Sequence, residues 1–146
     1  MKVYVGADHR GFELKGQLMA TLLEAGVDAV DLGPSEYNPD DDYNDAAIAV
    51  AQRVLAEPLA RGVLTCGSGD GMMMQTNRFK RIRAVDPRTE EECKVARWHH
   101  NANVLVLSAE ALSRDEAVAV LREFLSAPFS EQQRYINRIR KLDEVA

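Results

Sequence analysis

The sequence alternates between short apolar runs and longer stretches in which apolar residues recur every three or four positions. The apolar runs, each of strand length, are residues 2–6, 27–32, 62–66, 82–85 and 103–107. The stretches with helical spacing are residues 11–26, 44–55, a segment beginning near 71, 89–99, 113–125 and about 130–144. Strands and helices that alternate in this way form right-handed crossover units around a parallel sheet covered on both faces. The pattern therefore predicts an α/β fold, a three-layer αβα sandwich around a Rossmann-like, doubly wound, five-stranded parallel sheet.

Nothing in the sequence suggests a division into parts. A length of 146 residues suits one domain with a substantial core. The sequence has no internal repeat, linker or low-complexity segment. We therefore expect a single domain covering residues 1–146. Ser113 and Glu116 have the spacing of a capping box, which predicts that a helix begins there.

The charge balance and the cysteine count narrow the class of protein. The net charge is −5, and binding to a phosphate backbone needs a basic face, so no nucleic-acid partner is expected. No apolar run approaches the roughly 18–20 residues of a membrane span. Residues 1–5 lead into a strand without the layout of a signal peptide. The two cysteines, Cys66 and Cys93, suit a reducing compartment, so we expect a cytoplasmic protein with no membrane partner.

Basic residues gather near the end of this acidic chain. Residues 134–141 contain four basic side chains and no acid. Arg134 and Arg138 stand four positions apart, and hence on one face of a helix. The simple interpretation is a solvated surface. The alternative is a clamp for the phosphate of a small anionic ligand, because guanidinium groups bind phosphate oxygens in a forked geometry.

Polar segments follow the strands where a ligand is expected. Open parallel sheets bind their ligands at the carboxyl ends of the strands. Residues 7–11 follow the first strand, residues 66–71 follow the third, and the helix after the fourth strand ends at residues 99–101. All three segments carry side chains capable of catalysis, so we expect them to lie at one site.

The loop at Cys66 carries the clearest chemical signal. Gly67, Gly69 and Gly71 let the backbone turn its N–H groups toward one point, where the dipole of a helix beginning nearby adds positive charge. Such a nest stabilises an anion, so we expect the pKa of the Cys66 thiol to fall below its ordinary value of about 8.5. The plain alternative is a buried strand end followed by a tight turn. The histidine segments favour the chemical interpretation.

Several familiar motifs are absent around this loop. Met72 occupies the third glycine position of a dinucleotide-binding fingerprint and also the arginine position of a cysteine-phosphatase loop. No Gly-Lys-Ser/Thr follows, and neither cysteine has a Cys-x-x-Cys partner. The three histidines and Cys66 lack the spacing of zinc ligands on one helix face. We therefore expect no cofactor and no metal.

A series of short motifs runs through the chain from end to end. They are residues 6–12, 42–43, 66–71, Asn77, 82–84, His99, 103–105, Arg134 and Arg138. In this order they resemble the type B ribose-5-phosphate isomerase family, which includes galactose-6-phosphate and allose-6-phosphate isomerases. The resemblance implies an aldose–ketose isomerase that interconverts ribose 5-phosphate and ribulose 5-phosphate through a cis-enediolate. This chemistry needs a base, an anion hole and a ring-opening group, but no metal or nucleotide.

The resemblance assigns catalytic roles to individual residues. Cys66 matches the base that takes the proton from carbon, and His99 matches the residue that opens the sugar ring. Ser68 stands where the family usually has a threonine that helps to move protons at the sugar oxygens. The backbone amides expected to hold the enediolate oxygen belong to Gly67, Gly69, Asp70 and Gly71.

The same resemblance assigns the binding of substrate. Asp8 and His9 match substrate-binding positions, with His9 near the phosphate, and His100 follows the ring-opening histidine. Arg134 and Arg138 match phosphate ligands that the family contributes across a dimer interface. We therefore expect a small-molecule sugar phosphate as ligand. We also expect a homodimer, with a further pairing of dimers left open, in which the helix at about residues 130–144 packs on the partner.

Three departures from the family pattern leave the substrate open. His100 replaces the usual asparagine, Glu110 replaces a phosphate-binding arginine, and Asp70 replaces an apolar residue. Glu110 would weaken phosphate binding if it faces the site, and Asp70 would raise the pKa of Cys66 if it points inward. The alternatives are action on galactose 6-phosphate, allose 6-phosphate, a tetrose phosphate or a non-phosphorylated sugar. A non-catalytic relative that only binds a sugar phosphate is a further alternative.

Overall fold

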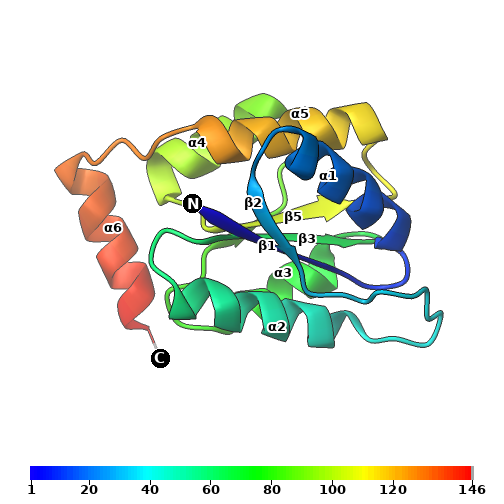
Figure 1. Cartoon of the computed structure of the whole chain (residues 1–146). Coiled ribbons are helices and arrows are strands. Elements are labelled where there is room, and N and C mark those ends of the chain that lie inside the picture. The colour runs from blue at the N-terminus through cyan, green and yellow to red at the C-terminus, as the bar shows by residue number, and fades with distance from the viewer. Residues whose placement is uncertain (146) are drawn as a thin grey trace.

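Five parallel strands form one sheet at the centre of the computed structural model, which describes residues 1–145 (Figure 1). The strands are β1 (Lys2–Ala7), β2 (Asp28–Asp31), β3 (Arg61–Cys66), β4 (Ala84–Val85) and β5 (Val104–Ser108). Their order across the sheet is β2-β1-β3-β5-β4. The chain therefore winds outward from β1 to β2 and then returns past β1 to β3, so the winding direction reverses between β1 and β3. Ligands of open parallel sheets bind at such a reversal.

Helices cover both faces of the sheet. They are α1 (Phe12–Glu24), α2 (Tyr43–Ala56), α3 (Asp70–Thr76), α4 (Glu90–His100), α5 (Arg114–Ser126) and α6 (Gln133–Glu144). α1, α4 and α5 lie on one face, and α2 and α3 lie on the other (Figure 1). The predicted three-layer α/β fold is therefore confirmed. None of the helices in the described part of the chain is long and apolar enough to cross a membrane.

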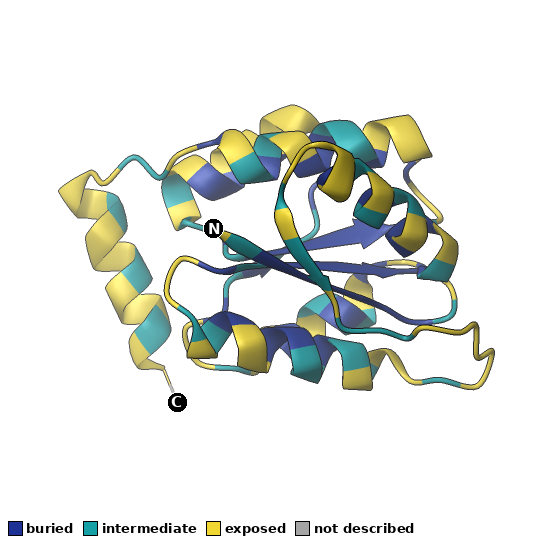
Figure 2. Ribbon diagram, viewed as in Figure 1, coloured by how far each residue is buried: buried dark blue, intermediate teal, exposed yellow. Residues whose placement is uncertain are grey.

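The sheet is apolar on both sides because each side packs against helices. Side chains of a strand alternate between the two faces. Val63 therefore lies in the core beneath α1, α4 and α5, whereas the next residue, Leu64, lies in the core beneath α2 and α3. Both are fully buried, as are most positions along the three central strands (Figure 2). This rigid base positions the loops at the carboxyl ends of β1, β3 and β5.

β4 and α6 both begin later than the apolar pattern predicts. A strand was expected at residues 82–85, but β4 contains only Ala84 and Val85. The reason is that the Arg83 N–H donates to the side-chain oxygen of Asn103, at 2.7 Å, and not to a neighbouring strand. The last helix begins at Gln133 and not near residue 130, because Glu131 has a left-handed backbone with φ of 56°. The capping box of Ser113 and Glu116 is confirmed.

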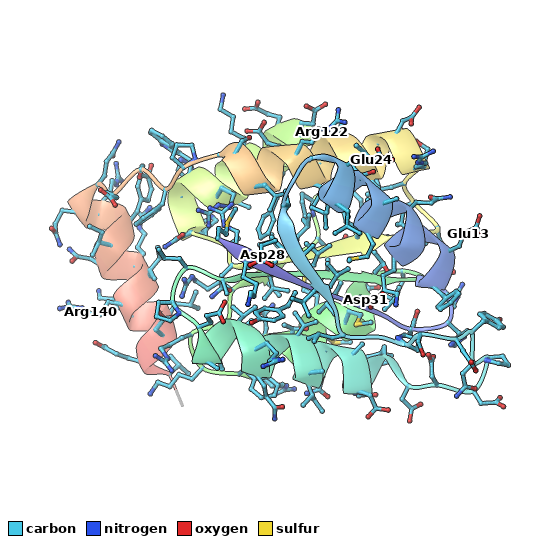
Figure 3. All side chains as sticks on the ribbon, viewed as in Figure 1. Glu13, Glu24, Asp28, Asp31, Arg122 and Arg140 are labelled. Atoms are coloured by element: carbon cyan, nitrogen blue, oxygen red, sulfur yellow. The ribbon has the colours of Figure 1, made fainter. Side chains whose placement is uncertain are left out.

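α6 stands apart from the rest of the molecule. It lies beside the start of β1, at the amino-terminal edge of the sheet, and none of its residues is buried (Figures 1 and 2). Arg140 projects from it away from the sheet (Figure 3). An ion pair between Asp143 and Arg83, the residue before β4, joins α6 to the rest of the molecule at 3.0 Å. The carboxyl-terminal edge, where a ligand is expected, lies at the other end of the strands.

Candidate active site

A polar cavity of about 250 Å³ opens at the carboxyl-terminal edge of the sheet. Its walls come from the loops after β1 and β3 and from the start of α2. The lining residues are Asp8, His9, Arg10, Asp41, Asp42, Tyr43, Cys66, Gly67, Ser68, Gly71 and Met72. The loops that follow neighbouring strands β1 and β3 therefore meet in one place, as the sequence predicts for two of its three polar segments.

Cys66 is the last residue of β3 and forms the floor of this cavity. It is only 4% exposed, and its Sγ accepts a hydrogen bond of 3.1 Å from the N–H of Gly69. Gly69 has a left-handed backbone, with φ of 94°, which a glycine adopts without strain. A side chain there would also collide with the carboxylate of Asp86. The glycine is thus required for the turn that brings an amide N–H onto the sulfur.

The expected lowering of the Cys66 pKa is wrong for this chain. Burial, together with the nearby carboxylate of Asp8, raises the pKa of the thiol to about 11. This value already includes the opposite effect of the N–H groups of Gly69 and Met72, which act as the nest was expected to do but only partly offset the burial. The thiol of the isolated chain is therefore protonated at neutral pH.

Asp8 and His9 occupy the turn after β1. The buried carboxylate of Asp8 accepts hydrogen bonds from the N–H groups of Arg10 and Gly11, at 2.9 and 3.0 Å. Asp8 therefore shapes the turn. His9 lies 2.7 Å through its Nδ1 from the carboxylate of Asp41. That contact fixes the orientation of the ring and leaves Nε2 as the nitrogen available to a ligand.

The turn after β1 is locked against the end of β3. The hydroxyl of Thr65 donates to the carbonyl of Gly11, at 2.8 Å, and the N–H of Asp8 donates to the carbonyl of Thr65, at 3.3 Å. Any side chain on Gly11 would overlap the Thr65 backbone. This close approach holds the Asp8 turn and the Cys66 loop in a fixed relation to each other.

The remaining residues predicted in the glycine loop divide between the cavity and the outside. Ser68 and Gly71 line the cavity, and the exposed Ser68 hydroxyl accepts a hydrogen bond from the Asp70 N–H, at 3.3 Å. Asp70 is exposed and does not line the cavity, so its carboxylate is not aimed at the sulfur. Gly69 contributes its N–H to Cys66 without lining the cavity.

Five lining residues were not selected from the sequence as site residues: Arg10, Asp41, Asp42, Tyr43 and Met72. Arg10 and Asp41 lie in loops whose side-chain directions the apolar pattern does not specify, and Tyr43 begins α2. The Tyr43 ring lies so close to Gly71 that a Cβ there would come within 2.7 Å of its Cζ. The pair of residues 42–43 was among the motifs carrying the resemblance, and that signal could have identified Tyr43.

His99 and the tail arginines form a separate cluster. The rings of His99 and Tyr135 stack, with centroids 4.6 Å apart and planes inclined by 21°. The guanidinium groups of Arg134 and Arg138 each lie 5.8 Å from the centroid of the same tyrosine ring. His100 is adjacent, with its ring 5.9 Å from that of His99. Burial, His99 and Arg138 lower the pKa of His100.

This cluster does not reach Cys66 within one chain, so the expectation that all three polar segments share one edge is wrong. A helix that follows a parallel strand begins at the carboxyl-terminal edge and runs back to the amino-terminal edge. α4 has 11 residues, a length of about 16 Å. His99 and His100, at its end, and Arg134 and Arg138, on α6, therefore lie at the far edge from the cavity (Figure 1).

A larger cavity of about 610 Å³ lies at this far edge, but arginine side chains that line it form hydrogen bonds that stabilise the fold. Among its arginines, Arg97 donates to the carbonyls of Ala127 and Ala102, and Arg61 donates to the carbonyl of Phe124. Within residues 1–145, no three histidine, cysteine, aspartate or glutamate side chains are grouped so as to hold a metal ion. The smaller cavity at Cys66 is therefore the candidate active site.

Comparison with known proteins gives concordant matches over nearly the whole chain. Residues 3–142 match the family model described as Ribose/Galactose Isomerase. The probable ribose-5-phosphate isomerase B of Mycoplasma pneumoniae is 38% identical over 140 residues, covering 96% of this chain and 91% of that protein. The ribose-5-phosphate isomerase B of Mycobacterium tuberculosis strain H37Rv is 35% identical over 144 residues, covering 99% and 89%.

Solved structures agree with these matches. A ribose 5-phosphate isomerase from Thermotoga maritima has a TM-score of 0.94 at 37% identity, covering 99% of this chain and 98% of that chain. The ribose-5-phosphate isomerase B from Mycoplasma genitalium, solved with bound ribulose-5-phosphate, has a TM-score of 0.92 at 34% identity. The match to it covers 97% of this chain and 93% of that chain.

Proposed function

This chain belongs to the ribose/galactose isomerase family, and on that basis we propose that it interconverts ribose 5-phosphate and ribulose 5-phosphate. The observation that carries the proposal is the cavity lined by Cys66, His9 and Ser68. It lies between β1 and β3, where the winding direction of the chain reverses. The bound ribulose-5-phosphate of the Mycoplasma genitalium relative supports the same class of substrate. The two free thiols, both buried, suit a reducing cytoplasm.

The proposed reaction is a proton transfer between neighbouring carbons. The Cys66 thiolate removes the proton from carbon 2 of the open-chain aldose, and the electron pair of that C–H bond forms the double bond of an enediolate. The carbonyl oxygen on carbon 1 gains the negative charge, which backbone N–H groups of the glycine loop stabilise. The Ser68 hydroxyl passes a proton between the two sugar oxygens. Return of the abstracted proton to carbon 1 completes the ketose, with no net gain or loss of protons.

A base with a pKa near 11 needs help to lose its proton at neutral pH. Burial in the isolated chain favours the neutral thiol. Cations placed beside the sulfur would favour the thiolate instead. The chain gathers the guanidinium groups of Arg134 and Arg138 in one place, beside the ring of His99, and they lie far from its own Cys66. A second copy of the chain can supply them.

The functional assembly proposed is therefore a homodimer in which each cavity is completed by the partner. The partner's His99 opens the sugar ring, and the partner's Arg134 and Arg138 hold the phosphate. The support is the exposed apolar face of α6, where Ile136 and Leu142 are 39% and 58% exposed. An amphipathic helix with no buried residue on its own chain is typical of a segment that packs on another molecule.

The test is turnover of a panel of phosphorylated aldoses, with ribose 5-phosphate expected as the best substrate. Cys66→Ala should lower kcat by about 10²–10⁴-fold, the usual contribution of a general base, while binding of ribose 5-phosphate is retained. Cys93→Ala is the matched control, because Cys93 is fully buried in the opposite core, and it should retain the wild-type kcat. Unchanged turnover in Cys66→Ala would reject the proposed base. Ligand binding without turnover of any sugar phosphate would favour a non-catalytic binding protein.

A further inference from the structure

Three loops from the central strands meet at an ion pair on the rim of the cavity. Arg10 follows β1, Gly67 follows β3 and Glu110 follows β5. The guanidinium of Arg10 pairs with the carboxylate of Glu110. It also lies flat on Gly67, where a Cβ would come within 2.7 Å of the arginine Cζ. The N–H of Glu110 donates to the carbonyl of Gly67, at 3.2 Å, which fixes Glu110 beside the glycine loop that follows Cys66.

The charges that line the cavity indicate that Arg10 matters for binding an anion. Arg10 is the only lysine or arginine among the residues that line the cavity in the described part of the chain. Three carboxylates, those of Asp8, Asp41 and Asp42, line it as well. The side chains of this subunit therefore present net negative charge to a phosphate dianion in the cavity, and Arg10 is the one lysine or arginine of the described lining that can attract it.

The ion pair between Arg10 and Glu110 is open enough for a phosphate to replace the carboxylate. The side chains of Arg10 and Glu110 are 56% and 49% exposed. An ion pair this open to water is weak, because water and salt screen it. A phosphate offers the same guanidinium a bidentate, doubly charged partner, which binds more strongly than a single exposed carboxylate.

We propose that Arg10 is a phosphate ligand supplied by the same subunit as Cys66, and that Glu110 competes with the phosphate for its guanidinium. This inference rests on the proposed function, since it names the group that recognises the phosphorylated end of the substrate. Glu110 then lowers the affinity of the cavity for phosphate. The pair selects for phosphorylated sugars, because a neutral sugar cannot displace the carboxylate.

Affinity measured without turnover provides the test. In a Cys66→Ala background, calorimetry with ribose 5-phosphate should show that Arg10→Ala raises Kd about tenfold, whereas Glu110→Gln lowers Kd about threefold. Free ribose, used as a second probe, should bind all these variants equally. In the active enzyme the same substitutions should change KM in the same directions with little change in kcat. Arg122→Ala is the control for lost charge, because Arg122 is exposed on α5 and far from the cavity, and it should leave Kd unchanged (Figure 3).

The results separate this inference from the proposed function. Normal isomerisation with a Kd that neither Arg10→Ala nor Glu110→Gln changes would overturn the inference and leave the function intact. A loss of affinity in Glu110→Gln would also overturn it, because it would make the acid a ligand and not a competitor. Tighter binding in Glu110→Gln and weaker binding in Arg10→Ala, in a protein that turns over no sugar phosphate, would support the inference while the proposed reaction fails. Failure of the wild-type protein to bind ribose 5-phosphate or inorganic phosphate would overturn it as well.

Discussion

The ring of His99 stacks on the ring of Tyr135, and so the end of α4 is tied to the start of α6. The same tyrosine ring receives the guanidinium groups of Arg134 and Arg138, each 5.8 Å from its centroid. An aromatic face attracts cations through its quadrupole. Tyr135 therefore gathers three residues with proposed roles in ring opening and phosphate binding into one unit, where the end of α4 meets the start of α6.

Replacing Tyr135 tests whether its ring organises this unit. Tyr135→Ala should lower kcat/KM for ribose 5-phosphate by about tenfold, because stacking and cation–π contacts of this kind are worth roughly 0.5–2 kcal/mol. Tyr135→Phe retains the ring and should remain within about twofold of the wild type. Steady-state kinetics on the three proteins make the comparison. Equal losses in the two variants would point to the hydroxyl and contradict the role given to the ring.

Sharing of the site between subunits predicts complementation. Cys66→Ala and His99→Asn protomers should each be nearly inactive alone. After unfolding and refolding together in equal amounts, half of the dimers are mixed and each of these has one intact site. The mixture should therefore recover about a quarter of the wild-type activity. No recovery, with mixed dimers demonstrated by mass spectrometry of intact complexes, would place Cys66 and His99 in the same subunit's site or in none.

The raised pKa of Cys66 predicts slow, pH-dependent alkylation. With a pKa of about 11, only about 0.1% of the thiol is thiolate at pH 8. In the substrate-free chain, diluted until the proposed dimer has dissociated, the rate of reaction with iodoacetamide should rise about tenfold per pH unit between pH 8 and 10, without a plateau. Peptide mass spectrometry follows each cysteine, and Cys93, whose pKa burial raises to about 12, is the internal control. A plateau below pH 9 in the dissociated chain would contradict the prediction, whereas a plateau that appears only in the assembled dimer would show that the partner lowers the pKa of Cys66.

Two glycines of the same region predict opposite changes in stability. Gly11→Ala should cost about 3 kcal/mol of unfolding free energy, because the new Cβ overlaps the Thr65 backbone and forces apart the loops after β1 and β3. Gly16 lies in α1, and no atom lies within 4 Å of the point that a Cβ would occupy there, so Gly16→Ala should gain about 0.5–1 kcal/mol from helix propensity. Urea unfolding measures both. A neutral Gly11→Ala would contradict the close approach of the two loops.

Burial of the Asp86 carboxylate predicts that its removal stabilises the fold to an extent that depends on pH. Its Oδ1 is buried without a hydrogen-bond partner, and burial raises the pKa of the carboxyl despite the nearby Arg88. A raised pKa in the folded state means that stability falls as pH increases from the unfolded pKa through the folded one. Asp86→Asn should therefore raise the melting temperature at pH 7, with a smaller gain near pH 3. A lower melting temperature at pH 7 would mean that the pair with Arg88 outweighs the burial.

The period of the apolar residues is sufficient to predict the layers and the loops that form the cavity. Short runs such as the one ending at Cys66 can only be buried strands when amphipathic helices lie on both sides of them in the sequence. The position of Cys66 and of the Asp8 turn then follows from the rule for open sheets. Arg10 and Asp41 could not be placed in this way, because the path of a polar loop depends on contacts between distant segments.

Two site predictions fail for physical reasons. The pKa of Cys66 is a balance of opposing effects, and the sequence displays the glycine amides but not the depth of burial or the approach of Asp8. The position of His99 depends on the direction of its helix, which the parallel topology already implies. The residues of the proposed site are thus in the sequence, but whether one chain can assemble them is decided by the length and direction of α4.

α6 has 12 residues and buries none of them against its own chain. A helix of this length is marginally stable in water by itself. On the proposed dimer, the ordering of this tail and the meeting of two molecules become a single transition governed by mass action. Dilution would then inactivate the protein without any inhibitor. Specific activity would fall in proportion to concentration once most chains are monomers.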